Sequence, residues 1–299
     1  MSAVAEEIRI DYKVPRRRHP VVAFVLQQPL GTAGLLIIIL MALSAIFAPL
    51  VAPYDPLTVD YAGLLAAPSA EHPLGTDNFG RDVLSRIIYG SQTALAVGFL
   101  SSLIGSTLGA IIGVTSAYFG GLTDMIIQRL MDIILAFPII VLALAVVSVL
   151  GKNVVFGIDW NLILAIGLPM VPKVARVVRS SALSIREMPY IDAARTAGFS
   201  HSRIIFRHIV PNVVAPYLIM LTAFVGQAIL LEASLSFLGL GVQEPKPAWG
   251  LMLAGDSANF YQEAPWMILF PGLAISLAVF AFNLFGDSLR DFLDPRFKV

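Results

Sequence analysis

Long runs of apolar residues separated by short polar segments dominate this chain. A helix needs about 20 mostly apolar residues to cross a hydrocarbon core of roughly 30 Å. Six runs reach or approach that length: residues 31–51, 93–118, 125–150, 160–178, 213–231 and 266–285. None alternates in polarity as the strands of a membrane barrel do. The pattern predicts an all-α, polytopic membrane protein with six transmembrane helices.

Three of these runs need comment. Pro169 and Pro172 interrupt the fourth, and Pro138 lies within the third, so we expect kinks there. The first run begins some thirty residues into the chain, is longer than the apolar part of a signal peptide and has no clear small-residue cleavage site. We therefore interpret it as a retained anchor helix.

Composition excludes several other classes of protein. Hydrophobic residues make up 57% of the chain and charged residues only 13%, against about 25% charged in a soluble domain. The 20 basic and 20 acidic residues cancel, which argues against nucleic acid as a partner. The absence of Cys excludes disulfides and thiolate sites. The four His residues are scattered without metal-ligand spacing, so no metal site is expected.

Basic residues predict the orientation. With the N-terminus inside, sixteen of the 20 fall on the cytoplasmic side, as the positive-inside rule requires. They are Arg9, Lys13, Arg16, Arg17, Arg18, Arg129, Lys173, Arg176, Arg179, Arg186, Arg195, Arg203, Arg207, Arg290, Arg296 and Lys298. The opposite side holds Arg81, Arg86, Lys152 and Lys246. An even number of spans then leaves both termini in the cytoplasm.

The longest internal loop has the composition of two short helices. Residues 189–197 favour a first helix with a small-residue face, and Gly198 would end it in the left-handed conformation. Ser200 would cap a second helix over residues 202–209, and Pro211 would stop it or begin the next span. These two basic helices could lie on anionic lipid headgroups or form a docking knob for a partner protein.

The same loop resembles the EAA motif of the membrane subunits of bacterial ABC importers. Ala193, Ala194, Gly198, Ile209 and Pro211 match the motif, and Asp192 stands where it usually has Glu. Residues 72–86, 232–241 and 281–295 extend the resemblance to the permeases for dipeptides, oligopeptides and nickel. The resemblance covers nearly the whole chain from about residue 30, in the right order.

This resemblance implies a type I ABC importer transmembrane domain in the bacterial cytoplasmic (inner) membrane. The expected partners are a second homologous permease subunit, two cytoplasmic ATPase subunits that hold ATP and magnesium, and an external substrate-binding protein. Asp192, Ala193, Ala194 and Gly198 are expected to contact an ATPase, with Ile209 and Pro211 completing the motif. Short peptides or a related small solute are the expected substrates. No cofactor is expected in this chain.

The chain is then organised in five parts. Residues 1–29 form a cytoplasmic tail, 30–52 the anchor helix, and 53–92 an external loop with an amphipathic helix. Residues 93–286 form a five-helix permease core with a cytoplasmic coupling loop, 179–212, and 287–299 form a cytoplasmic tail.

A glycine-spaced segment, residues 75–82, imitates a phosphate-binding P-loop. Arg81 replaces the expected Lys, and Asp82 replaces the Ser or Thr that would hold magnesium. A carboxylate there would repel phosphate, so we expect a turn followed by an amphipathic helix over residues 82–89. ATP hydrolysis is therefore expected on another chain, and this subunit is not expected to be an enzyme.

Three further features lie within the spans. Small residues recur every fourth position in the second run and predict close helix packing, within this chain or with a second subunit. They are Ser101, Gly105, Gly109, Gly113 and Ala117. Glu232 is either a pore or gate residue or an interfacial Glu paired with a nearby Arg or capped by backbone donors. Arg129 and Asp132 are spaced to pair on one helix face.

Two other functions remain open on the sequence. An ion-coupled secondary transporter would favour carboxylates or His in mid-membrane and inverted repeats. The sequence has few such carboxylates and no clear repeat. A membrane assembly subunit without a transport role is the other alternative. Co-purification with an ATPase and ATP-dependent uptake would distinguish the three.

Overall fold

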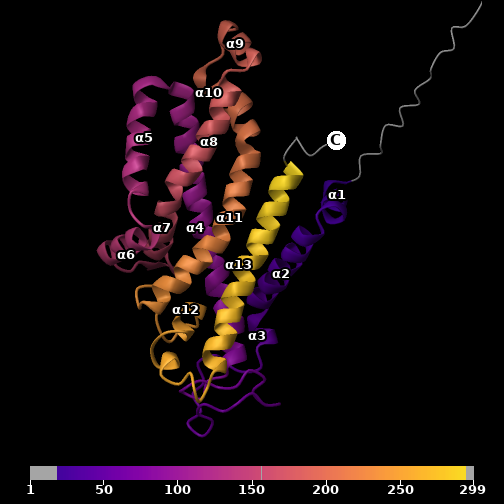
Figure 1. The fold of residues 1–299 in the computed structure, drawn as a ribbon, viewed down its shortest axis with the longest axis vertical. Coiled ribbons are helices and arrows are strands. Elements are labelled where there is room, and N and C mark those ends of the chain that lie inside the picture. Colours follow the sequence, from indigo (N-terminus) through magenta and orange to yellow (C-terminus); the bar gives the residue numbers. More distant parts are fainter. Residues whose placement is uncertain (1–18, 156, 294–299) are drawn as a thin grey trace, which may run out of the picture.

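The structure, a computed structural model, describes residues 19–155 and 157–293, which form an elongated bundle of helices (Figure 1). Of the predicted basic residues in the two tails, Arg9, Lys13, Arg16, Arg17, Arg18, Arg296 and Lys298 lie outside this part. The helices of 15 residues or more are α2 (Pro29–Ile46), α4 (Val83–Phe119), α5 (Gly121–Leu135), α8 (Val171–Arg186), α11 (Val210–Phe237) and α13 (Trp266–Leu293).

Shorter elements connect these helices. They are α1 (Pro20–Gln27), α3 (Ala48–Val51), α6 (Ile139–Leu150), α7 (Trp160–Gly167), α9 (Pro189–Thr196), α10 (His201–Ile204) and α12 (Trp249–Met252). Two 3₁₀ turns, Leu168–Met170 and Gly255–Ala258, and a π turn, Ile205–Ile209, complete the helical part. The strands β1 (Val154–Val155) and β2 (Ile158–Asp159) form a small antiparallel hairpin.

The membrane spans agree with the apolar runs. Five helices of the described residues are long and apolar enough to cross a membrane, and a bent pair brings the number to six. The fourth run forms a span despite its prolines: α7, the 3₁₀ turn and α8 make one helix over Trp160–Arg186. Pro172 lies in the first turn of α8, where its missing N–H leaves no hydrogen bond unmade.

The third run is not the single straight span that its hydropathy suggests. It divides into α5 and α6, which meet at 93°. Phe137 precedes Pro138, and the proline ring disfavours helical backbone at the residue before it. The hairpin after α6 lies beside the loop after α11, where Lys246 Nζ donates a hydrogen bond to the Gly157 carbonyl at 2.8 Å.

The amphipathic helix predicted over residues 82–89 is not a separate element. Asp82 is the N-cap of α4, and its carboxylate accepts a hydrogen bond from the Ser85 N–H at 2.7 Å. From there α4 runs without a break through the second apolar run. Gly90 lies inside α4, at the point where this helix approaches the Trp249 ring.

The small-residue stripe packs α4 against the α7–α8 span of the same chain. A Cβ on Gly105 would lie 2.5 Å from the Gly167 carbonyl oxygen, and one on Gly113 equally close to that of Ala175. These backbones approach each other as small residues in membrane helices allow. The predicted close packing is therefore confirmed, and its partner lies within this chain.

Replacement of Gly109 should disrupt this contact. A Cβ there would lie 2.7 Å from the Val171 carbonyl oxygen and from the Val174 side chain, so Gly109→Leu must push the two helices apart. Overpacking of this kind costs about 1–3 kcal/mol or more. We expect a lower apparent Tm of the purified chain in detergent. Ile111→Leu, on the exposed face of α4, is the control, and an equal effect of both variants would contradict the packing argument.

Both described ends of the chain lie at one end of the bundle. The Phe24 ring in α1 contacts the Phe292 ring in α13, with centroids 5.4 Å apart. Figure 1 shows α9 toward that same end, here called the α9 end, and α12 with the 52–82 loop at the opposite α12 end. An even number of crossings follows from this placement.

Candidate coupling site and the opposite charge cluster

Gly198 forms the elbow that the sequence predicts. Its φ is +78°, and α9 ends there in a Schellman motif. The Gly198 N–H donates to the Arg195 carbonyl at 3.0 Å, and the Phe199 N–H donates to the Ala194 carbonyl at 3.1 Å. These two bonds satisfy carbonyls that the helix end would leave unpaired. The chain then turns sharply toward α10.

The second helix of the loop differs from the prediction. It begins at His201 and is capped by the Ser200 hydroxyl, which accepts from the Arg203 N–H at 3.4 Å. It does not end at residue 209. It continues through the π turn into α11, so that residues 201–237 form one helix. Pro211 occupies the first turn of α11, a position that proline tolerates.

The segment from α9 to α10, residues 189–204, is here called the knob. Its inner side belongs to the main hydrophobic core: Ile191, Ala194 and Ile204 are all buried. The Tyr118 hydroxyl at the end of α4 lies 2.7 Å from His201 Nδ1. The Arg203 guanidinium lies over the Phe199 ring, 3.9 Å from its centroid. The core residues and the Tyr118–His201 contact anchor the knob on the bundle, and the Arg203–Phe199 contact lies within the knob.

The structure places the predicted motif residues on two sides of this segment. Asp192, Ala193, Gly198 and Pro211 are exposed. Ala194 and Ile209 are buried within the chain, so they position the knob and do not offer a surface to another subunit. Asp192 accepts a hydrogen bond from Arg195 Nη1 at 2.9 Å, which gives its charge a partner within α9.

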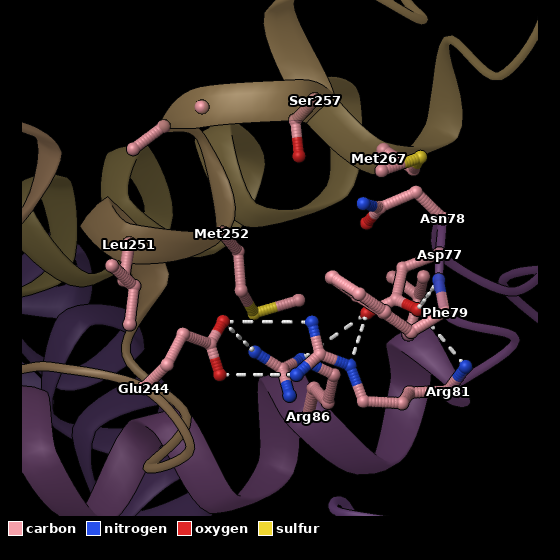
Figure 2. A pocket seen from close by; sticks show the side chains of 13 residues that line it. Asp77, Asn78, Phe79, Arg81, Arg86, Glu244, Leu251, Met252, Ser257 and Met267 are labelled. Atoms are coloured by element: carbon pink, nitrogen blue, oxygen red, sulfur yellow. Dashed lines mark hydrogen bonds and ion pairs between the residues drawn. The ribbon is translucent and has the colours of Figure 1, made fainter. Parts of the chain in front are cut away.

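At the α12 end the structure contains a charge cluster that sequence reasoning missed (Figure 2). Arg81 and Arg86 converge on Glu244, from the loop after α11. Arg81 Nη1 donates to Glu244 Oε2 at 3.0 Å, and Arg86 Nη2 donates to Oε1 at 3.1 Å. Arg81 Nε also donates to Asp77 Oδ2 at 2.7 Å. The Arg86 side chain is 1% exposed. Two cations thus meet two carboxylates in a largely buried site.

Asp77 also occupies the backbone donors of residues 75–82, the segment that imitates a P-loop. Its Oδ1 accepts hydrogen bonds from the Phe79 and Arg81 N–H groups at 2.8 and 2.9 Å. In a phosphate-binding loop, backbone N–H groups of this kind would bind the anion. Here an in-chain carboxylate takes them, and Asp82 turns to cap α4 and contact His72 at 2.9 Å. The segment is a tight turn that carries Arg81 into the charge cluster.

Sequence comparisons identify the family. The model of the binding-protein-dependent transport system inner membrane component matches residues 105–299. The chain belongs to this family. A second model, the N-terminal TM domain of oligopeptide transport permease C, matches residues 25–68. The chain is thus a multi-pass membrane protein and the pore-forming subunit of an ABC importer.

Individual relatives agree with this assignment over most of their length. A dipeptide transport system permease of Alkalihalophilus pseudofirmus is 46% identical over 273 residues, which cover 90% of this chain and 86% of that protein. A glutathione transport system permease of Escherichia coli is 41% identical over 273 residues, covering 91% and 88%. A putative peptide transport system permease of Brucella suis is 42% identical over 270 residues, covering 89% and 88%.

A solved structure shows the same fold. The inward-facing MetNI methionine ABC transporter superposes with a TM-score of 0.54 at 16% identity, over 70% of this chain and 96% of that one. At this identity the likeness concerns the fold alone. It agrees with the type I importer architecture that the spans of this permease predict.

Glu232 of the permease is buried and has a hydrogen-bond partner on its own helix. The side chain is 1% exposed in α11, and its Oε1 accepts a hydrogen bond from the Ser236 hydroxyl one turn later, at 2.7 Å. The Val242 N–H donates to the same hydroxyl at 3.0 Å. Within residues 19–155 and 157–293, no Arg or Lys forms an ion pair with Glu232. In this conformation Glu232 joins the end of α11 to the following loop, and a role as gate stays a prediction.

Proposed function

We propose that this permease carries short peptides across the bacterial inner membrane and that its knob docks on an ATPase subunit. The observation that supports the docking is the placement of the knob. In Figure 1, α9 stands beyond the ends of α5, α8 and α11, while its inner side is anchored in the core. An exposed helix on a rigid base can transmit a push from a partner to the bundle. A segment that lay loosely on lipid would need no such anchoring.

The proposed assembly contains two permeases, two ATPases and an external binding protein. ATP and magnesium are assigned to the ATPases. The turn at residues 75–82, which imitates a P-loop, uses its own Asp77 to fill the backbone donors. Peptides are the proposed substrates because the relatives named above are permeases for dipeptides, peptides and glutathione.

Uptake by the reconstituted complex tests this function. The permease, its partner permease, both ATPases and the binding protein are placed in vesicles, and labelled dipeptides and tripeptides are supplied outside. We expect uptake only when ATP and magnesium are on the ATPase side and the binding protein is present. Uptake that follows an ion gradient without ATP would indicate a secondary transporter. A complex that holds the permease but takes up no solute would favour the assembly subunit.

Both termini are proposed to be cytoplasmic, because Arg186, Arg195, Arg203 and Arg207 all lie in or next to the knob at the α9 end. A reporter that is active only outside the cytoplasm, fused after Val299, should therefore be silent, and a cytoplasmic reporter at the same site should be active. The same pair of reporters inserted in the 52–82 loop should give the opposite result. Activity of the external reporter after Val299 would overturn this orientation.

A further inference from the structure

Helix α8 has one apolar and one polar face. Its apolar face, formed by Val171, Val174, Ala175, Val178 and Ala182, is buried. Val177 is exposed on the opposite face, together with four polar residues: Lys173, Arg176, Ser180 and Ser184. These four polar residues are spaced by three, four and four positions, so they lie one above another on one side of the helix. We call them the α8 polar face.

The first half of the α8 polar face lies at membrane depth. The glycines that α8 contacts on α4 fix its level: Gly109 meets Val171 and Val174, and Gly113 meets Ala175 and Arg179. These glycines lie five to nine residues inside the second apolar run, which ends at residue 118. At 1.5 Å per residue, this is roughly 7–13 Å from the end of that run.

The charges at this level are only partly neutralised. Arg176 contacts Asp132 of α5, and these side chains are 50% and 42% exposed. Lys173 forms no hydrogen bond or ion pair with any described residue, and its side chain is exposed. Arg129 of α5 contacts the same carboxylate, so two arginines share Asp132, and Lys173 is left without a carboxylate partner among the described residues. Half-exposed charges at membrane depth require water or a polar partner, because hydrocarbon solvates them poorly.

The lipid-compatible surface of this region lies elsewhere. Helix α5, beside α8, exposes Ile126, Leu130 and Ile133, while its Asp124 and Asp132 turn toward Arg179 and Arg176 of α8. The apolar side of α5 suits hydrocarbon, and the α8 polar face does not. The two surfaces therefore have different surroundings in the membrane.

We infer that the α8 polar face lines the water-filled path of the permease, and that Lys173 and Arg176 bind the carboxylate of the passing solute. This inference rests on the proposed transport of peptides, whose C-termini are carboxylates. Arg176 offers a planar fork of donors to a carboxylate, and Asp132 holds that fork in position. Lys173 supplies the uncompensated charge. The serines farther along the same face continue a polar surface toward the α9 end.

Cysteine labelling tests the path without any need for transport. The chain has no Cys, so each single variant has a clean background within this subunit. Lys173→Cys, Ser180→Cys and Ser184→Cys are compared, in the assembled complex, with Ile126→Cys and Leu130→Cys on α5. A charged methanethiosulfonate reagent should modify the α8 positions at least about tenfold faster, because hydrocarbon excludes the reagent.

The charge of the reagent refines this test. At Ser180→Cys, an anionic reagent should react faster than a cationic one of similar size, and Lys173→Gln in the same chain should reduce that preference. α8 cysteines as unreactive as the α5 controls would mean that lipid or another subunit covers this face, and the inference would fail. Equal rates for the two reagents at Ser180→Cys would refute the proposal that Lys173 and Arg176 bind a carboxylate.

Uptake measurements test the carboxylate directly. Lys173→Gln should slow the uptake of a free peptide about tenfold, as truncating one partner of a charge pair does, and should leave its C-terminal amide unchanged. Binding of both peptides to the binding protein is measured separately. Lys152→Gln, in the loop before β1, is the control. Equal slowing of both peptides would overturn the assignment. Failure of the unaltered complex to take up any peptide would refute the proposed substrate, while the labelling result would still stand or fall by itself.

Discussion

A Gly198→Val permease is expected to insert into the membrane and yet lose ATP-driven uptake. Gly198 has a φ of +78°, and this left-handed conformation costs an ordinary residue roughly 1–2 kcal/mol. Apart from Gly198 and its two neighbours in the chain, no residue that the structure describes has an atom within 4 Å of the position where a Cβ would be added. The strain would therefore arise in the elbow backbone, and the added bulk would face whatever docks there. The spans should insert, because their hydrophobic residues are unchanged.

Two controls separate backbone strain from lost docking. Asn adopts the left-handed conformation more readily than most other residues, so the Gly198→Asn permease should retain more activity than the Gly198→Val permease. Ser202→Ala changes an exposed position of α10 and should cost no more than about 1 kcal/mol, the value of one hydrogen bond. Uptake in vesicles and co-purification of the ATPase are measured in parallel. Normal uptake with a retained ATPase in Gly198→Val would favour the lipid-surface interpretation of the loop.

The sequence predicts the spans and the local helix ends well, because each depends on neighbouring residues. An apolar run of sufficient length identifies a span whatever it packs against. Gly198 and Ser200 mark the end of α9 and the start of α10 by their own backbone and hydroxyl chemistry. The recurrence of Gly105, Gly109 and Gly113 likewise announces a close helix contact, although only the structure shows that α8 supplies the partner.

Features set by tertiary packing are not visible in the sequence. Pro138 predicts a break in the third run, but the 93° angle depends on how α6 lies against α7. The helix expected over residues 202–209 has no stop signal after it, since Pro211 fits the first turn of α11 as well as it would end a helix. Here the local signal was ambiguous, and the core contacts of Ile204 and Ile209 decide for a continuous helix.

The charge cluster at the α12 end shows the same limit more strongly. Glu244 and Arg86 are 158 residues apart in the chain, and no periodicity links them. Glu232 and Ser236, by contrast, are four residues apart on one helix face, so the i,i+4 spacing could have identified this hydrogen bond. The roles predicted for Glu232, a pore residue or an interfacial Glu with an Arg partner or a backbone cap, do not include this bond to Ser236.

An Arg86→Ala permease is expected to be strongly destabilised, and this is the largest effect on folding that the structure predicts. The Arg86 side chain is 1% exposed and donates to Glu244 and to the Pro56 carbonyl. Its removal deprives Glu244 of one of its two cations. The change also leaves a cavity where the buried Arg86 side chain packs, and truncating a large buried side chain to Ala costs about 2–5 kcal/mol. The apparent Tm of the purified complex and the yield of folded permease should both fall.

The matched control is Arg129→Ala, which also removes an arginine from an ion pair. The Arg129 side chain is 79% exposed, and its Nη1 lies 3.7 Å from Asp132 Oδ2. Exposed pairs contribute little, because water solvates both partners and salt screens them. Arg129→Ala should therefore leave the Tm nearly unchanged. Equal losses in Arg86→Ala and Arg129→Ala would refute a special role for the cluster.

A double variant isolates the pair itself. If Arg86 and Glu244 stabilise each other, Arg86→Ala combined with Glu244→Ala should cost less than the sum of the single changes, because both changes remove the same interaction. Glu244 is 46% exposed, so Glu244→Ala alone should cost less than Arg86→Ala: water can reach the carboxylate, and Arg86 keeps Asp77 within 3.7 Å. Strict additivity would mean that Arg86 acts through its packing and its bond to Pro56, and that the charge of Glu244 is incidental to the fold.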